Sequence, residues 1–155
     1  MSTDYFAVQS GTPIEPGRMV TVDQDLPRLE LASGIVARAL LGSNLLVSFV
    51  RWQPHALAPL HAHAEEQVFV VLEGQLEITL GREVRLMGPG EAAHIPAWVE
   101  HSVRSFDTPA YQIDVFDPPR QAFLDLLAQV AARPAGSEDV GNAPLSEPSG
   151  TPPAP

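Results

Sequence analysis

The feature that most constrains the fold is a series of short β-prone segments between Gly17 and Phe116. These segments are rich in Val, Ile, Leu and Phe, and turn-forming residues separate them. Many short strands at this spacing are typical of a β-sandwich or barrel, not of alternating strands and helices. The predicted strands are Met19–Val22, Arg28–Leu31, Ile35–Leu41, Leu45–Trp52, Gln67–Leu72, Gln75–Leu80, Glu83–Leu86, Ala92–Ile95, Ser102–Phe106 and Tyr111–Phe116.

Glycines mark the turns between these strands. Glu73-Gly74 and Gly81-Arg82 lie between predicted strands and are interpreted as compact hairpin turns. Glycine suits such turns because it adopts positive φ without a steric cost. Gly88-Pro89-Gly90 is a further strong break in the pattern.

One helix is predicted after the last strand. Asp117 is its expected N-cap, and Pro118-Pro119 suit the first turn, where a missing N–H has no consequence. Helical spacing is then shown by the apolar residues Phe123, Leu124, Leu127 and Val130. The helix is expected to lie against the outside of the barrel and to end near Arg133-Pro134.

The sequence predicts a single folded domain with two flanking segments. Its 155 residues, of which 45% are hydrophobic, suffice for one domain with its own core. We expect an N-terminal extension at residues 1–16, the domain at residues 17–133 and a Pro/Ala/Gly/Ser-rich tail at residues 134–155. The tail has no aromatic residue. It is predicted to be disordered because it cannot bury enough apolar surface to offset the entropy of ordering.

Charge and composition exclude several classes of partner. The formal net charge is -10, with 9 Lys and Arg residues and no basic cluster, which predicts no binding to nucleic acid or membranes. There is no cysteine. A bound metal would therefore need His, carboxylate or amide ligands. No secretory signal follows Met1 and no apolar run suffices to span a bilayer, so a cytoplasmic location is expected.

The run His61-Ala62-His63-Ala64-Glu65-Glu66-Gln67 concentrates possible metal ligands. Alternate side chains of an extended strand share one face, so His61, His63 and Gln67 are predicted to point the same way. Glu65 has the same parity and is a competing oxygen ligand. It is expected in the bend before the strand, where parity is least reliable. An imidazole cluster on a rigid strand suits Zn, Fe, Ni, Cu or Mn.

Two longer patterns contain these residues and a third histidine. The first is Pro59-Leu60-His61-Ala62-His63-x3-Gln67-x6-Gly74, and the second is Pro89-Gly90-Glu91-x3-Ile95-Pro96-x4-His101. Together they resemble the two motifs of the cupin superfamily. This resemblance implies an all-β, double-stranded β-helix (jelly-roll) barrel with one C-terminal helix. It also implies one divalent transition metal, Zn, Ni, Fe or Mn, ligated by His61, His63, Gln67 and His101.

Gln67 departs from the general cupin pattern, which has Glu at this position. A neutral amide oxygen leaves a divalent metal with more of its positive charge than a carboxylate does. This favours Lewis-acid chemistry on an anionic or enolic oxygen. It also removes an anionic ligand that would stabilise a higher oxidation state, so non-redox chemistry is predicted.

A second group of polar residues lies at the end of the last predicted strand. Gln112, Asp114 and Phe116 alternate there, and Arg120 follows. The segment from Asp114 to Arg120, together with Glu66-Gln67 and His94-Ile95-Pro96, resembles the pectin-degradation cupins, which linearise unsaturated uronates. The resemblance implies that Asp114 moves a proton, that Arg120 holds the substrate carboxylate and that Phe116 lies in the pocket. The alternative is structural, with Asp114 paired to Arg120 or to another cation and Phe116 simply packed.

Further pocket residues are predicted with less support from the pattern. Gln112 and Trp98 are expected to line the substrate pocket together with Phe116. His94 faces either the pocket mouth or solvent. One of Arg51 and Trp52 must face the interior, and strand parity alone does not say which.

Taken together, the residues predict a non-redox, Lewis-acid enzyme of lyase or isomerase type. Its substrate would be a small oxygenated anion such as an unsaturated uronate, in carbohydrate metabolism. The alternatives are an aromatic polyketide cyclase, a non-catalytic ligand-binding or metal-binding cupin, and a metal-dependent dioxygenase. A large apolar pocket would favour the cyclase, whereas a small one lined by Arg120 and Asp114 favours the uronate enzyme. A homodimer is also expected, with Leu45–Val50 and the N-terminal strands as candidate edges.

Overall fold

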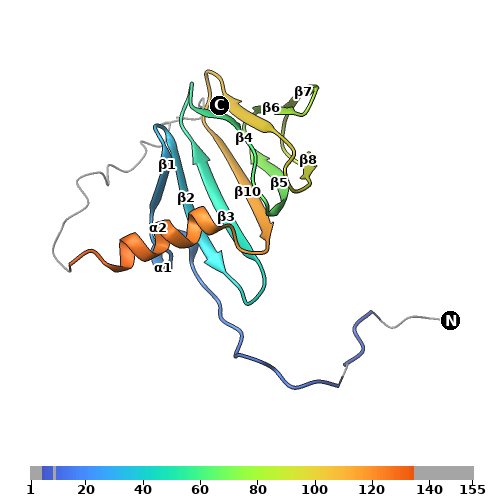
Figure 1. Cartoon of the computed structure of the whole chain (residues 1–155), viewed down its shortest axis with the longest axis vertical. Coiled ribbons are helices and arrows are strands. Elements are labelled where there is room, and N and C mark those ends of the chain that lie inside the picture. Colours follow the sequence, from blue (N-terminus) through green and yellow to red (C-terminus); the bar gives the residue numbers. More distant parts are fainter. Residues whose placement is uncertain (1–4, 9, 135–155) are drawn as a thin grey trace, which may run out of the picture.

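The computed structural model describes residues 5–8 and 10–134, and in this part of the chain the strands form two antiparallel sheets (Figure 1). The two sheets face each other as a sandwich, and the last helix follows the final strand. The predicted all-β jelly-roll with one C-terminal helix is therefore confirmed. The disorder predicted for the tail falls, beyond Pro134, outside the described residues.

Each sheet combines strands that are distant in sequence. The six-stranded sheet has the order β1 (Leu29–Ala32), β2 (Ile35–Leu41), β3 (Leu46–Trp52), β10 (Ala110–Asp117), β5 (Glu66–Glu73) and β8 (Ala92–Ile95). The four-stranded sheet has the order β4 (Leu57–His61), β9 (His101–Ser105), β6 (Leu76–Leu80) and β7 (Glu83–Met87). Two helices complete the described fold, α1 (Val22–Asp25) and α2 (Gln121–Ala131).

The inner face of the six-stranded sheet is mostly apolar but includes one polar patch. Alternate residues of β3, β5 and β10 are buried, as expected for strands with one face in a core. Most of these inward side chains are apolar. On the same inner face, however, the structure buries Ser48, Gln67, Gln112 and Asp114. Buried polar side chains are costly unless they are paired, so this patch indicates a function for this part of the interior.

Two predicted strand assignments were wrong. Met19–Val22 is not a strand, because the chain turns into α1 at Val22, where the Asp25 carboxylate accepts a hydrogen bond from the Thr21 N–H at 2.6 Å. Conversely, β4 was not predicted, since Pro59 lies inside it. Proline is tolerated in edge strands, and β4 is an edge of the four-stranded sheet.

The predicted helix is present, but it begins later than expected. Asp117 is the last residue of β10, and α2 begins at Gln121 with Arg120 at the N-cap. Phe123 is buried in the interior, and the core is also contacted by Leu126, Leu127 and Val130. The helix, orange in Figure 1, thus packs against the core through its apolar residues, whereas the sequence predicted a position against the outside of the barrel.

The turn glycines behave as predicted. Gly74 has a φ of +72° and Gly81 a φ of +58°, both in the left-handed region that favours glycine. At Gly74 a Cβ atom would also lie 2.4 Å from the carbonyl oxygen of Pro109. Gly74 therefore meets a steric as well as a conformational requirement.

One predicted dimer edge was wrong. Leu45–Val50 falls largely in β3, which lies between β2 and β10 and so has no free edge. The edge strands are β1 and β8 in one sheet and β4 and β7 in the other. The homodimer itself stays a prediction. Neither described helix combines the length and the apolar character of a membrane span.

Candidate metal centre

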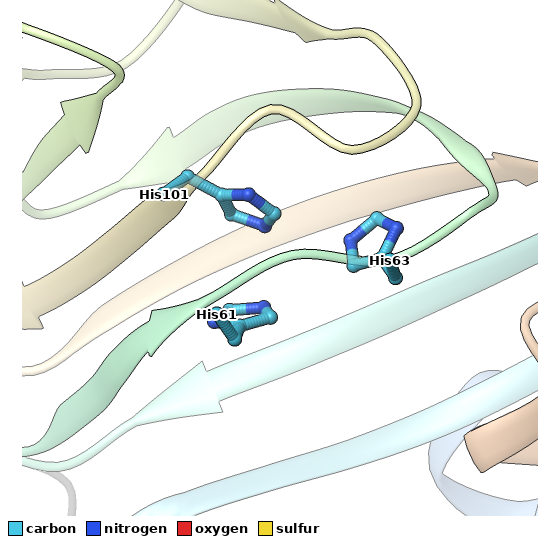
Figure 2. A group of neighbouring side chains, drawn as sticks. All are labelled: His61, His63 and His101. Carbon is cyan, nitrogen blue, oxygen red and sulfur yellow. The ribbon is translucent and has the colours of Figure 1, made fainter.

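Three histidines converge at one end of the interior (Figure 2). His61 ends β4 and lies directly opposite His101, the first residue of β9, with their ring centroids 4.2 Å apart. His63 lies in the connection between β4 and β5. One ligand atom from each of the three lies within 4.8 Å of the others. The three predicted histidine ligands are thus brought together.

The convergence has a different origin from the one predicted. His61, His63 and Gln67 do not share a single extended strand, because β4 ends at His61 and β5 begins at Glu66 in the other sheet. The chain crosses between the sheets at residues 62–65. Side chains from both sheets and from the crossing therefore meet in the interior, and strand parity does not explain their direction.

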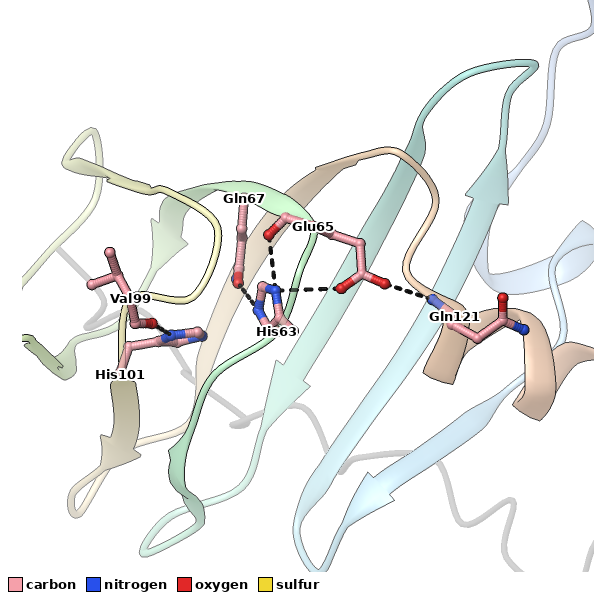
Figure 3. Close-up of polar contacts among 6 residues, drawn as sticks. All are labelled: His63, Glu65, Gln67, Val99, His101 and Gln121. Carbon is pink, nitrogen blue, oxygen red and sulfur yellow. Dashed lines mark hydrogen bonds and ion pairs between the residues drawn. The ribbon is translucent and has the colours of Figure 1, made fainter.

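Backbone carbonyls orient all three imidazole rings. The Nδ1 atoms of His61, His63 and His101 lie 2.7, 2.9 and 2.8 Å from the carbonyl oxygens of Pro59, Glu65 and Val99. Figure 3 shows two of these contacts. A carbonyl oxygen only accepts hydrogen bonds, so in His61 and His101 a proton on Nδ1 satisfies it and leaves Nε2 with its lone pair. Such contacts fix the tautomer and orientation that metal-ligating histidines need.

Burial keeps two of these histidines neutral. It lowers the pKa of His101 to about 4, and together with the nearby Arg120 charge it lowers the pKa of His63. The Nε2 atom of His101 is buried and has no hydrogen-bond partner among the described residues. Transition metals bind neutral imidazole, so these lone pairs are available as ligands at neutral pH.

Gln67 lies beside the histidines and faces them with its oxygen. Its Oε1 atom is 3.1 Å from the Nε2 atom of His63, while its Nε2 atom donates to Oδ1 of Asp114 at 2.7 Å. Both ring nitrogens of His63 thus face oxygen acceptors. A cation bound by Nε2 of His63 and Oε1 of Gln67 would satisfy both of these atoms. The site therefore fits the nitrogen and oxygen donor set of a divalent transition metal.

Glu65 is engaged elsewhere than in the histidine cluster. Its Oε1 atom accepts the backbone N–H of Gln121 at 3.0 Å, and its Oε2 atom lies 3.5 Å from Nδ1 of His63 (Figure 3). Glu65 therefore satisfies the first N–H of α2 and contacts the outer side of the His63 ring. The sequence named Glu65 as a competing metal ligand, and only the fold reveals the helix end that it meets.

His94 points away from the site. It forms an ion pair with Glu66, Nε2 to Oε1 at 2.6 Å, and both side chains are exposed. The sequence left open whether His94 faces the pocket mouth or solvent, and the structure places it at the surface.

A cavity of about 250 Å³ adjoins the histidines between the two sheets. Its walls are largely apolar and include Trp52, Phe116 and Phe123. Its polar lining residues are His61, Gln67, His101, Gln112, Asp114 and Arg120. Of the predicted pocket residues, Gln112 and Phe116 thus line the cavity. Trp98 does not: its side chain is 70% exposed, and its backbone N–H donates to the carbonyl oxygen of His63 at 2.8 Å.

The structure also decides which residue of β3 faces the cavity. Trp52 is 3% exposed and lines the cavity, whereas Arg51 lies on the outer face and pairs with Asp23 at 3.1 Å. Because Leu46, Ser48 and Val50 are buried, Trp52 continues their inward alternation.

Asp114 is a buried carboxyl group held from both sides. Gln67 donates to its Oδ1 atom at 2.7 Å, and Gln112 donates to its Oδ2 atom at 3.1 Å. Burial raises the pKa of Asp114 to about 6, and the two amide hydrogen bonds and the Arg120 charge oppose this rise. The group therefore titrates close to neutral pH, where a carboxyl group can both accept and release a proton.

Arg120 brings a cation to the same cavity. Its guanidinium lies 5.7 Å from the centroid of the Phe116 ring, and burial lowers its pKa. It forms no ion pair with Asp114 or with another carboxylate among residues 5–8 and 10–134. The structural alternative, in which Arg120 and Asp114 pair, is therefore not observed.

Comparison with known proteins finds similarity to cupins, both in sequence and in fold. Residues 48–116 match the family model described as "Cupin domain". Among solved structures, an RmlC-like cupin from Shewanella frigidimarina has a TM-score of 0.63 at 21% identity, covering 69% of this chain and 96% of that one. The structure of KdgF from Halomonas sp. has a TM-score of 0.63 at 22% identity, covering 70% of this chain and 99% of that one. At these identities the likeness shows the shared fold alone.

A curated relative matches a shorter stretch. Dimethylsulfoniopropionate lyase DddQ from Ruegeria pomeroyi is 32% identical over 69 residues, which are 43% of this chain and 34% of that protein. The match therefore spans about a third of the relative's length.

Proposed function

We propose that this protein, whose residues 48–116 match the cupin domain model, is a metal-dependent, non-redox enzyme acting on a small carboxylate such as an unsaturated uronate. The observation that carries this proposal is the Arg120 guanidinium, which forms no close ion pair with a carboxylate of the described residues and lies in the wall of a cavity also lined by Asp114, His61 and His101. His63 completes the histidine cluster beside this cavity. This arrangement provides an anchor for an anion, a group that transfers protons and a metal site.

Arg120 supports an anionic substrate. Removing a guanidinium from water is unfavourable unless an anion compensates it. Its planar fork of N–H donors matches a carboxylate, with two parallel hydrogen bonds. A substrate carboxylate bound here would lie in the same cavity as Asp114 and the histidines.

The size of the cavity supports a small substrate. About 250 Å³ lies below the range of about 300–1,000 Å³ that is usual for drug-sized ligands. A monomeric sugar acid is small enough for this space, whereas a fused-ring aromatic polyketide needs a larger pocket. The aromatic polyketide cyclase is therefore the weaker alternative.

Asp114 supports proton transfer as the chemistry. With a pKa of about 6 it is mostly ionised at neutral pH and can still be protonated during turnover. Gln67 and Gln112 hold its two oxygens in place. A divalent metal held by His61, His63 and His101, with Gln67 beside them, would supply Lewis-acid polarisation of a substrate oxygen. Asp114 would then move a proton between carbon and oxygen atoms of the bound acid.

The test uses the full chain loaded in turn with Zn, Ni, Fe or Mn and mixed with an unsaturated uronate. Loss of the ultraviolet absorbance of its conjugated double bond reports turnover. We expect Asp114→Asn to lower kcat by about 100-fold or more, because general acid–base catalysis contributes on that order, with metal content unchanged. Arg120→Lys is expected chiefly to raise KM. If none of the four metals supports turnover, the uronate assignment is wrong.

A second candidate is a lyase acting on dimethylsulfoniopropionate, favoured by the 32% identity to a lyase of that name. Here Asp114 would take the proton next to the carboxylate. The C–H electron pair would form the new double bond, and the C–S pair would leave with dimethyl sulfide. The same protein preparations, assayed for dimethyl sulfide release, separate the two candidates.

A further inference from the structure

We propose that Trp52 and Gln112 form a second polar subsite in the cavity, which binds one hydroxyl group of the substrate. This inference rests on the proposed function and narrows it, because it states which small carboxylates the cavity would select. The subsite involves side chains from β3 and β10, whereas the histidines come from β4, β9 and the connection that follows β4.

Besides Nε2 of His101 in the histidine cluster, two buried polar atoms of cavity-lining residues have no hydrogen-bond partner in the described part of the chain. The Nε1 atom of Trp52 and the Oε1 atom of Gln112 form no hydrogen bond within the described part of the chain. The two side chains are only 3% and 2% exposed, and both line the cavity. Buried polar atoms are almost always hydrogen-bonded. Two unpaired atoms in one wall therefore indicate a polar partner that enters the cavity.

The strand register brings these two side chains together. Trp52 lies opposite Ala110, and Gln112 lies opposite Val50, so Trp52 and Gln112 are diagonal neighbours on the inner face. Diagonal neighbours on adjacent strands are about 7–8 Å apart, within reach of long and aromatic side chains. One small group between them can therefore contact both.

The chemistry of the two atoms specifies that group. The indole Nε1–H only donates, and the amide oxygen of Gln112 only accepts. The amide nitrogen of Gln112 is engaged, since it donates to Asp114 at 3.1 Å. A hydroxyl group accepts from Trp52 and donates to Gln112, and so satisfies both. A carboxylate or carbonyl oxygen satisfies Trp52 alone, and a sulfonium group satisfies neither.

The rest of this wall restricts how many hydroxyl groups can enter. Trp52 and Gln112 are surrounded by apolar lining residues, including Ile35, Val50 and Val103. A further buried hydroxyl among them would lose its hydrogen bonds to water without replacement. The favoured ligand is thus a small hydroxy acid, with its carboxylate at Arg120 and one hydroxyl at the subsite. Such a ligand fits a sugar-derived acid better than dimethylsulfoniopropionate.

The test measures binding by calorimetry to the zinc-loaded full chain. The probes are straight-chain acids of four to six carbons that carry a hydroxyl at successive positions, each compared with its unhydroxylated parent. We expect at least one hydroxy acid to bind about tenfold more tightly than its parent, since leaving the two wall atoms unpaired costs roughly that factor. Trp52→Phe is expected to reduce this preference to less than threefold while the affinity for the parent acid stays within twofold. Gln112→Met, which also removes the amide donor to Asp114, is expected to reduce the preference in the same way.

The outcomes separate this inference from the proposed function. Acids that bind without any preference for a hydroxyl group, or with a preference that both variants retain, overturn the subsite and leave the carboxylate anchor standing. The neutral amides of the same acids test the hydroxyl subsite in the absence of a carboxylate. A hydroxyl preference among the amides that Trp52→Phe abolishes, without binding of the acids, supports the subsite and overturns the role of Arg120. If neither acids nor amides bind, both proposals are wrong.

Discussion

Gln67 connects the candidate metal site to Asp114, the proposed proton-transferring group, through its single amide. Its oxygen faces His63, and its nitrogen donates to Asp114. Gln112 then donates to the other oxygen of Asp114. A carboxylate at position 67 would have no N–H to donate to Asp114. The amide therefore stabilises the ionised form of Asp114, the proposed proton-transferring group.

Replacing Gln67 with the glutamate of the general cupin pattern tests this role. We expect Gln67→Glu to raise the pKa of Asp114 further, because a donor is lost and a like charge is gained. The ascending limb of the pH–rate profile should shift to higher pH, and metal affinity should rise. The check is a pH–rate profile beside a metal titration. An unchanged pH profile would contradict the role given to the amide.

The raised pKa of Asp114 also leads to a prediction of how the stability of the metal-free protein depends on pH. Its folded pKa of about 6 lies above the ordinary value of 3.8, so its contribution is most favourable below 3.8 and is lost as pH rises through 6. The loss is about 3 kcal/mol, at about 1.36 kcal/mol per pKa unit. The Asp114→Asn variant should therefore gain about 3 kcal/mol relative to the unmodified protein between about pH 4 and pH 7. Urea unfolding at a series of pH values, with chelator present, measures this difference, and a constant difference would contradict the burial argument.

At the scale of single elements, α2 depends on a residue from another part of the chain. Arg120 at its N-cap provides no side-chain hydrogen bond, and the Glu65 carboxylate accepts the N–H of Gln121 instead. This contact fixes the start of α2 beside the His63 ring. It also supports Arg120 and Phe123 at the cavity, because both belong to this end of the helix.

The helix contact is tested by a matched pair of neighbouring glutamates. Glu65→Ala should destabilise the protein by about 1 kcal/mol, the usual cost of losing a helix cap. Glu66→Ala removes only an exposed pair with His94 and should change stability by less than about 0.5 kcal/mol. Thermal unfolding of the two variants checks this prediction. Equal effects would indicate that Glu65 does not hold the helix.

The two hairpin glycines provide a second matched pair. Gly74→Ala must adopt positive φ and also place a Cβ 2.4 Å from the Pro109 oxygen, whereas Gly81→Ala meets nothing within 4 Å. We expect about 1 kcal/mol of destabilisation at Gly81 from backbone conformation alone, and a clearly larger loss at Gly74. Denaturant midpoints of both variants measure the difference. A Gly74→Ala variant as stable as Gly81→Ala would mean that the Pro109 turn moves aside easily.

At the scale of the whole molecule, the metal site connects parts of the fold that are distant in sequence. His61 and His101 lie on adjacent strands of one sheet, and Gln67 lies on the other sheet. A ligand that binds only the folded form stabilises it, by about 2.7 kcal/mol at a hundredfold excess over Kd. Metal binding should therefore raise the melting temperature of the entire domain.

Metal removal tests this coupling. Chelator treatment should lower Tm, and adding zinc should restore it. His101→Ala should abolish the zinc-dependent rise, while His94→Ala, an exposed histidine outside the cluster, should retain it. Differential scanning fluorimetry with and without zinc is sufficient. A zinc-dependent rise that persists in His101→Ala would contradict the histidine site.

Much of the fold was predictable from the sequence because its signals are local. Hydrophobic alternation located most strands, including Ile35–Leu41 and Ala92–Ile95 with the observed bounds. Glycine identified the turns at Gly74 and Gly81. Met19–Val22 was wrongly predicted as a strand because an Asp-stabilised turn begins α1 there. The strand β4 was missed because it contains a proline, which an edge strand tolerates.

By itself, the sequence determined the fold class and the residue types of the site, because residue spacing and side-chain chemistry are properties of the chain. Only the tertiary structure decided how these residues meet. It placed the histidines at a crossing between sheets, Glu65 at a helix end, Trp52 inside and Arg120 in the cavity without a carboxylate partner. These relations depend on strand pairing between distant segments, such as β10 with β3 and β5. Such pairings are set by the packing of the whole interior and leave no signal within any one segment.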